Sequence, residues 1–437
     1  MRSHRSLSID ASNGRIRTRR ALAALLAGGL IAAACGSDDE AEPPAEPAAE
    51  EEVAEEEAAE EEVAEDEPAE EVVPPSGDPI KIMATGTIES PVFSVPNTPV
   101  GAQIAVDEIN AAGGVNGRPL ELLVCNDELD PNKAAGCIQQ AIDEGVVSLV
   151  SGLSVFEALV FPQLNEAGIP WIGSATSTDF STPILFPLAA DGATAFSAVG
   201  FAAVDRGGCE TPAVFISSQG SDANADAVSA GVEAAGGTVS SVHQGQGPDF
   251  APLVESALAD GADCITSVVS PPENAGLITA IAGRVPVISL DGPLPEQLVA
   301  DLGDAVDGTL IAGGYRLAAA GDANVLELAA KSAELFPEAY IDNFWVHGYV
   351  GVNIIAEVLE GSDDTSAAAV LAGLPSITDF DTGFGPIIDF STPNTAPGYE
   401  RIFNTDMLLW EANGGVITLV EGVDYDMQSA LDILGAG

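Results

Sequence analysis

Basic side chains are scarce in this sequence. Its 437 residues include 14 Lys and Arg against 68 Asp and Glu, and six of the 14 lie within the first 20 positions. A protein that binds nucleic acid needs clustered Lys and Arg to contact phosphates. The composition therefore excludes a nucleic-acid partner. Such acidity is also typical of a salt-adapted surface, so we expect stability to rise with molar salt.

The common motifs of enzymes are missing as well. There is no GxSxG, HExxH or GxxxxGK[ST], and no GxGxxG opens a helix after a strand. Beyond the N-terminal region only His243 and His347 occur, and His347 lies in an apolar helical segment typical of a core or cleft histidine. Asp127 and Asp130 in NDELDP resemble acidic residues of a calcium-binding loop. We favour the interpretation that these residues form a turn that opens the next helix. We predict a protein that is not an enzyme and has no cofactor or metal.

Long apolar runs are limited to residues 21–34, which follow six arginines and precede Cys35. Fourteen residues rise about 21 Å as a helix, too little to span a hydrocarbon core of about 30 Å. A basic start, a short apolar stretch and small residues are typical of an export signal. The segment resembles a bacterial lipoprotein signal, in which the cysteine is lipidated and becomes the N-terminus. A twin-arginine signal at Arg19-Arg20 and a buried core helix are the alternatives.

Residues 35–77 are predicted to form a disordered acidic tether behind the lipidated Cys35. From Asp38 to Glu71 there are nineteen acids and no base. Such a segment repels itself and cannot bury enough apolar surface to fold. Residues 1–34 would then be the signal peptide, and the protein would sit at the extracytoplasmic face of the membrane, held by its lipid alone. A functional acidic tail that binds cations or basic partners is the alternative.

Cysteines are few. Besides Cys35 the chain has Cys125, Cys137, Cys209 and Cys264, with no CxxC spacing. An even number in an oxidising compartment favours disulfides over metal ligation, although three pairings and four reduced thiols are all conceivable. We favour Cys125–Cys137 and Cys209–Cys264, because in a flavodoxin-like strand order the strands next to the latter pair are neighbours.

From residue 80 onward, strands and helices alternate. Apolar residues recur at helical spacing in Pro99–Ala112, for example, between apolar strands at Ile80–Ala84 and Leu120–Val124. A second series of the same kind starts at Pro212–Ile216. About 358 residues are too many for one ordinary core. The pattern predicts an α/β protein with two doubly wound parallel-sheet lobes.

Several segments resemble the branched-chain-amino-acid-binding family, the type I solute-binding proteins of ABC transporters. They are GAQIAVDEINAAGGVNGRPLELLVCNDELDP (101–131), SGLS (151–154), NEAGIPWIGSATS (165–177), LDG (290–292) and the closing GPIIDFSTPN…LLWEANGGVITLVEG (385–422). The resemblance implies a type I periplasmic binding protein fold, with two lobes joined by three crossovers near 195–199, 312–319 and 383–388. It places residues 78–196 and 319–384 in the N-terminal lobe and residues 197–318 and 385–437 in the C-terminal lobe.

The resemblance also implies a ligand site. The family's carboxylate-holding serine corresponds to Ser154, and its next loop to Ser174, Ala175 and Thr176. The acid that meets a ligand ammonium corresponds to Asp291. Ser154 at a helix start suits a ligand carboxylate, but simple N-capping is the alternative. For Asp291 the alternative is a turn residue before Gly292.

The sequence departs from the family pattern at several of these loops. Gly220 replaces a tyrosine, the loop SPPEN (270–274) lacks an aromatic, and Glu157 stands where a small hydroxyl residue is common. We therefore expect a monomeric, lipid-anchored binding protein that passes a small polar solute, an amino acid or a related amide or amine, to an ABC permease. The alternative is an anchored sensor that presents its bound state to a separate receptor.

Overall fold

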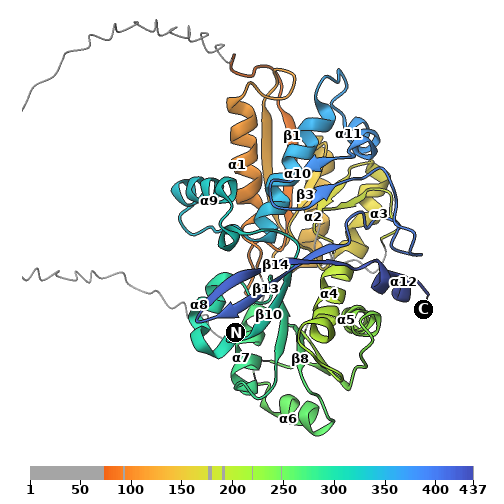
Figure 1. The fold of residues 1–437 in the computed structure, drawn as a ribbon. Coiled ribbons are helices and arrows are strands. Elements are labelled where there is room, and N and C mark those ends of the chain that lie inside the picture. The colour runs from red at the N-terminus through yellow and green to blue at the C-terminus, as the bar shows by residue number, and fades with distance from the viewer. Residues whose placement is uncertain are drawn as a thin grey trace, which may run out of the picture. The chain divides into compact units, whose positions relative to one another are not determined.

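The computed structural model describes residues 73–91, 94–175, 180–188, 192–218, 220–247 and 249–436. The predicted signal peptide, Cys35, the tether up to residue 72 and Thr176 lie outside these residues. Within them, no helix is both long and apolar enough to cross a bilayer. The described chain is a mixed α/β protein with two large sheets, which define a first and a second lobe (Figure 1).

The first lobe contains a parallel sheet of five strands in the order β2-β1-β3-β4-β5. The strands are β1 (Ile80–Gly86), β2 (Leu120–Asn126), β3 (Leu149–Ser151), β4 (Trp171–Gly173) and β5 (Leu185–Pro187). Helices α1 (Thr98–Ala111) and α10 (Asn343–Leu359) pack on one face, and α2 (Pro131–Glu144) and α3 (Glu157–Ala167) on the other. Neighbouring residues of β1 point to opposite faces of the sheet. Ile82 packs in the core under α1 and α10, and Met83 packs in the core under α2 and α3.

The second lobe contains a sheet of seven strands in the order β14-β13-β10-β9-β8-β6-β7. Its parallel strands are β6 (Ala213–Ile216), β7 (Ser241–Gln244), β8 (Ile265–Val268), β9 (Val287–Leu290) and β10 (Thr309–Gly313). Helices α4 (Gly192–Asp205) and α5 (Asp222–Ala234) cover one face, and α6 (Ala251–Ala259) and α7 (Pro271–Ile281) the other. The predicted alternation of strands and helices in parallel-sheet lobes is confirmed.

An antiparallel hairpin extends this second sheet beyond the prediction. Strands β13 (Asp406–Asn413) and β14 (Val416–Asp426) add to β10 in antiparallel fashion. The remaining helices are α8 (Glu296–Leu302), α9 (Ala323–Leu335), α11 (Ala367–Gly373) and α12 (Gln428–Ala436). A small sheet pairs β11 (Phe380–Asp381) with β12 (Ile387–Ile388), and 3-10 turns cover Gly303–Val306, Ala318–Ala320 and Leu374–Ser376.

The segments that connect the lobes differ in part from the predicted crossovers. Residues 195–199 are the middle of α4, which packs on the second sheet, so the chain has crossed before them. The segment after β12 stays with the first lobe. Phe390 meets Phe186 edge to face, Phe403 stacks on Phe186, and the guanidinium of Arg401 lies 4.1 Å from the ring centre of Phe186. The predicted boundary at residue 385 assigns this segment to the second lobe, whereas its contacts join it to the first. The chain enters the second sheet with β13.

Both favoured disulfides are present in the structure. Cys125 at the end of β2 pairs with Cys137 of α2, and Cys209 pairs with Cys264 just before β8. β6 and β8 are neighbours in the sheet, as the flavodoxin-like order requires. The second bridge joins the segments that precede these two strands, at the sheet edge where both strands begin.

Each lobe also contains one pair of helices in unusually close contact. In the first lobe α1 and α10 cross at Gly101 and Gly348, where an added Cβ would lie 2.0 Å from the Trp345 carbonyl oxygen and 2.1 Å from that of Thr98. In the second lobe α4 and α5 cross at Gly200 and Gly231, with corresponding distances of 2.0 and 1.8 Å to backbone oxygens. No side chain fits at these four positions, so glycine sets the spacing of both helix pairs.

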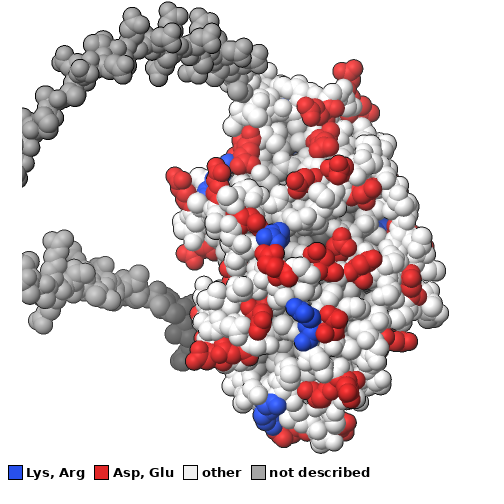
Figure 2. Space-filling model, viewed as in Figure 1, with Lys and Arg blue, Asp and Glu red and all other residues white. Residues whose placement is uncertain are grey.

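Acidic side chains are spread over the molecular face shown in Figure 2, and basic ones are few. Several bases pair with acids, including Lys81 with Glu144 at 2.6 Å and Arg284 with Glu255 at 2.6 Å. Such exposed pairs contribute little to stability. The net charge is therefore a dispersed surface property.

Candidate functional site

A cavity of about 370 Å³ lies between the loops that follow the strands of the two sheets. Ligands of parallel α/β sheets bind at this edge. Among the described residues that line the cavity, none has a charged side chain. The lining comprises Leu129, Leu153, Val155, Ser174, Gly192, Ala195, Phe196, Ser217, Ser218, Gly220, Ser221, Asn224, Val268, Val269, Ser270, Pro271, Leu290, Gly292, Pro293, Asn343 and Phe344.

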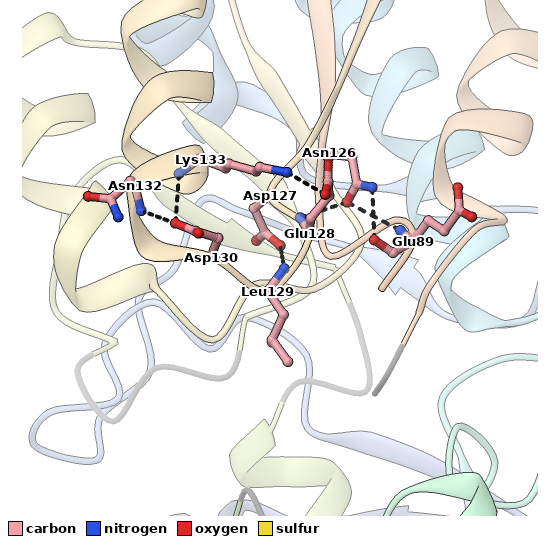
Figure 3. A network of polar contacts seen from close by, with 8 residues as sticks. All are labelled: Glu89, Asn126, Asp127, Glu128, Leu129, Asp130, Asn132 and Lys133. Atoms are coloured by element: carbon pink, nitrogen blue, oxygen red, sulfur yellow. Dashed lines mark hydrogen bonds and ion pairs between the residues drawn. The ribbon is translucent and has the colours of Figure 1, made fainter. Parts of the chain in front are cut away.

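The first lobe contributes an apolar wall. Leu129 comes from the loop between β2 and α2, and Leu153 and Val155 come from the loop between β3 and α3. Glu128 and Leu129 have φ values of 48° and 58°, a left-handed conformation that is uncommon outside glycine. In Figure 3 the Leu129 side chain points away from the polar side chains of its own loop.

The buried carboxylate of Asp127 holds this wall in place. Its Oδ1 accepts hydrogen bonds from Thr87 Oγ1 at 2.7 Å and from the Leu129 N–H at 2.9 Å. Its Oδ2 accepts from Ser154 Oγ at 2.8 Å. One side chain thus ties together the loops that follow β1, β2 and β3, and we call this arrangement the Asp127 clasp.

The rest of the NDELDP segment forms a turn. Asp130 caps α2 by accepting from the Asn132 N–H at 2.8 Å, and Glu128 forms an ion pair with Lys133 (Figure 3). Pro131 occupies the first turn, where its missing N–H costs nothing. These contacts agree with the turn interpretation rather than with a calcium loop.

Ser154 lies where the sequence placed it, after β3 and before α3, but it does not line the cavity. It is buried, its hydroxyl hydrogen is directed to Asp127, and its Oγ accepts from the Phe156 N–H at 3.3 Å. The first turn of α3 already carries a buried carboxylate, Glu157. A carboxylate at this helix start offsets the positive end of the helix dipole.

The second lobe contributes a wall of serines organised by Glu273. The Glu273 carboxylate accepts from Ser217 Oγ at 2.7 Å, from the Ser218 N–H at 3.1 Å, and from both the Oγ and N–H of Ser270 at 2.8 and 3.0 Å. Burial raises the pKa of Glu273, but the hydrogen bonds from these serines outweigh it and hold that pKa below its usual range. This Glu273 clasp joins the loops after β6 and β8.

Behind the cavity the two lobes bring two acids together. Asp291 lies between the lining residues Leu290 and Gly292, is 6% exposed, and accepts from the Gly292 N–H at 2.7 Å. Its Oδ2 has no hydrogen-bond partner among the described residues. Burial raises its pKa to about 7, with a further contribution from the charge of Asp342.

Asp342 belongs to the first lobe, where it caps α10 by accepting from the Trp345 N–H at 2.7 Å. It also accepts from Asn97 Nδ2 at 2.8 Å, and burial raises its pKa to about 6. The next residue, Asn343, lines the cavity and is 5% exposed. Its Oδ1, like Asp291 Oδ2, has no partner among the residues that the structure describes.

The other predicted site residues have different positions. Ser174 lines the cavity, whereas Ala175 is fully buried in the core of the first lobe. Sequence reasoning missed two aromatic lining residues, Phe196 of α4 and Phe344 of α10. Both lie in apolar helical segments, so they could not be told apart from core residues. They provide the ring surface that the loops at Gly220 and at residues 270–274 lack.

Two further groups give no additional site. His347 is fully buried within α10, in keeping with the prediction of a core or cleft histidine. Asp263 lies close to Cys209 and Cys264, but these cysteines form a disulfide and offer no thiolate to a metal.

The model of the family described as "Periplasmic binding protein" matches residues 79–413. The leucine-, isoleucine-, valine-, threonine- and alanine-binding protein of Pseudomonas aeruginosa is 36% identical over 76 residues. That match covers 17% of this chain and 20% of the Pseudomonas protein.

Solved structures share the fold. A leucine-binding protein LivK from Thermotoga maritima has a TM-score of 0.65 at 17% identity, and the match covers 79% of this chain and 99% of that one. A fatty acid ABC transporter substrate-binding protein from Thermomonospora curvata has a TM-score of 0.67 at 18% identity, covering 82% and 95%. The similarity extends over both lobes of the described chain.

Proposed function

Because this chain belongs to the periplasmic binding protein family, whose members are solute-binding proteins rather than enzymes, we propose that it captures a small solute in the cavity between its two lobes. The observation that carries the proposal is the position of the cavity. Its lining comes from the carboxyl edges of both sheets. A ligand there contacts both lobes at once and favours the arrangement in which they meet.

The ligand would be an amino acid or a related amide or amine. This range is supported by the matched Pseudomonas protein, which is named for amino acids, and by the small polar groups that line the second lobe. Asp291 and Ser174 remain the predicted contacts of a polar head group. Phe196 and Phe344 would enclose its apolar part.

The biological role would be delivery of the solute to an ABC permease. The solved ABC transporter substrate-binding proteins from Thermomonospora curvata and Desulfitobacterium hafniense support this role by fold. Lipid attachment through Cys35 and an extracytoplasmic location remain predictions from the sequence. An anchored sensor that signals through a separate receptor is the second candidate, and transporter genes beside this one would favour delivery.

A thermal-shift screen of the purified protein against amino acids, amides, amines and short peptides tests the proposal. A ligand at about 100 times its dissociation constant adds roughly 2.7 kcal/mol to the free energy of unfolding. We expect at least one class to raise the melting temperature, and Phe344→Ala to weaken that effect. If no solute raises it at low or high salt, solute capture in this cavity is rejected.

A further inference from the structure

We infer that the cavity selects a solute that donates hydrogen bonds through an amine or primary amide on an apolar body, and that it discriminates against a carboxylate. This inference rests on the proposed function and defines the ligand chemistry of the same cavity. It departs from binding of an ordinary α-amino acid, which carries both an ammonium and a carboxylate.

The first argument is the state of the serine hydroxyls. A hydroxyl has one hydrogen, and Ser217 and Ser270 each direct theirs to Glu273 Oε2. Because the carboxyl of Glu273 has a pKa below its usual range, it stays ionised near neutral pH. It therefore continues to accept the hydrogen bonds from both serine hydroxyls. Toward other atoms these two oxygens can then only accept hydrogen bonds.

The second argument is the pair of buried acceptors. Asp291 Oδ2 and Asn343 Oδ1 have no hydrogen-bond donor among the described residues, and both side chains are more than nine-tenths buried. Leaving a buried acceptor without a donor costs free energy. These acceptors come from opposite lobes, since Asp291 follows β9 and Asn343 begins α10. Asn343 lines the cavity, so a ligand N–H group there can supply the donor that its Oδ1 lacks.

The third argument concerns the place that the family resemblance assigns to a ligand carboxylate. Ser154 directs its hydroxyl hydrogen to Asp127, and the buried Glu157 occupies the first turn of α3. A carboxylate at this position would meet two further buried carboxyl groups. Among the described lining residues there is also no Lys, Arg or His to compensate.

The apolar body follows from the remaining surface. The first-lobe wall consists of Leu129, Leu153 and Val155, and Phe196 and Phe344 add two rings. Apolar side chains of this kind favour a ligand with a hydrocarbon part. The two walls together therefore suit a molecule with a hydrogen-bond-donating head and an apolar tail.

Three ligands with one carbon skeleton test the inference: 4-methylpentanamide, 4-methylpentylamine and 4-methylpentanoate. Dissociation constants would be measured by calorimetry on the whole protein. We expect the amide or the amine to bind at least tenfold more tightly than the carboxylate, and the comparison of the two distinguishes a neutral from a cationic head. Equal or tighter binding of the carboxylate overturns the inference, and so does binding of none of the three.

The general solute screen separates this failure from failure of the proposed function. If leucine or another carboxylate binds and Phe344→Ala weakens that binding, the proposed solute capture is supported. The inferred preference against carboxylates is then rejected.

Variants of the serine wall test the mechanism. Ser217→Ala removes a cavity acceptor and should reduce amide or amine affinity several-fold. Ser229→Ala is the matched control, because that hydroxyl donates to the Ala225 carbonyl oxygen within α5 and lies outside the cavity. Glu273→Gln, which can itself donate to a serine, should shrink the preference over the carboxylate. An unchanged preference in both Ser217→Ala and Glu273→Gln contradicts the acceptor mechanism.

Discussion

The two lobes use the same device at the ligand edge of their sheets, but with different results. In each lobe one buried carboxylate collects hydrogen bonds from loops that follow neighbouring strands. Asp127 does this in the first lobe and Glu273 in the second. Only in the second lobe do the clasped hydroxyls, Ser217 and Ser270, line the cavity. The first-lobe clasp thus supplies shape, whereas the second-lobe clasp supplies polar selectivity.

A further difference concerns the acids behind the cavity, and it leads to the largest expected effect. Asp342 of the first lobe accepts from both Asn97 and Trp345, whereas Asp291 of the second lobe accepts only from the Gly292 N–H among the described residues. Burial raises the pKa of Asp291 from 3.8 to about 7. The unfolded chain loses this proton near pH 4, whereas the native protein keeps it to about pH 7.

Stability without ligand should therefore fall as the pH rises from 4 to 7. The contribution of Asp291 to this loss is roughly 4 kcal/mol, because each pKa unit corresponds to about 1.4 kcal/mol. Asp291→Asn should remove it and stabilise the protein at pH 8, as urea unfolding at several pH values would measure. Asp342→Asn is the comparison, with a change that ends near pH 6. If Asp291→Asn unfolds with the same pH dependence as the wild type, the buried acid is not responsible.

Breaking the Asp127 clasp is expected to cause the next largest loss of stability. Asp127→Ala leaves Thr87, Ser154 and the Leu129 N–H without their acceptor, and losing such a buried network costs about 3 kcal/mol. Asp130→Ala is the control, because it removes only an exposed helix cap and should cost much less. Chemical denaturation measures both. Equal losses in the two variants contradict the view that Asp127 holds three loops.

Breaking the Glu273 clasp should cost less stability and more affinity. Glu273→Gln keeps the shape of the side chain but replaces a double acceptor by one acceptor and one donor, so we expect a loss of about 1–2 kcal/mol. Ligand affinity should fall at least tenfold, because two cavity serines lose their orientation. The affinity of Asp127→Asn, measured in the same way, sharpens the comparison. If Asp127→Asn weakens binding more than Glu273→Gln, the division of roles between the lobes is reversed.

The smallest effects are expected on the surface of both lobes. Glu255→Ala removes an exposed pair with Arg284 and should change stability by less than about 0.5 kcal/mol. Molar salt screens the dispersed acidic charge, so the melting temperature should rise between 0.1 and 2 M NaCl. A melting temperature that falls with salt speaks against a salt-adapted surface.

Much of the fold could be predicted from the sequence because its signals are local. Alternating strands and amphipathic helices, some of them ended by a glycine such as Gly145 or Gly168, require only neighbouring residues to be recognised. The hairpin of β13 and β14 escaped prediction, since its pairing with β10 joins residues about 100 positions apart. The packing of Phe390 and Phe403 on Phe186 joins residues more than 200 positions apart.

The site was harder to predict than the fold for the same reason. Ser154 could be placed at the carboxyl edge of β3, but the direction of its hydroxyl depends on Asp127, which arrives from another loop. Asp291 could be placed beside the cavity, but its raised pKa depends on burial and on Asp342 from the other lobe. Phe344 reads as a core residue until the fold turns the start of α10 toward the cavity.

The glycine crossings in the two helix pairs have a consequence for genetic data. In a survey of random substitutions scored by growth or transport, Gly101, Gly348, Gly200 and Gly231 should rank among the least tolerant positions, because any side chain there collides with a backbone oxygen. None of the four lines the cavity. Intolerance alone would therefore map architecture as well as function, and measuring folded protein abundance beside activity would separate the two.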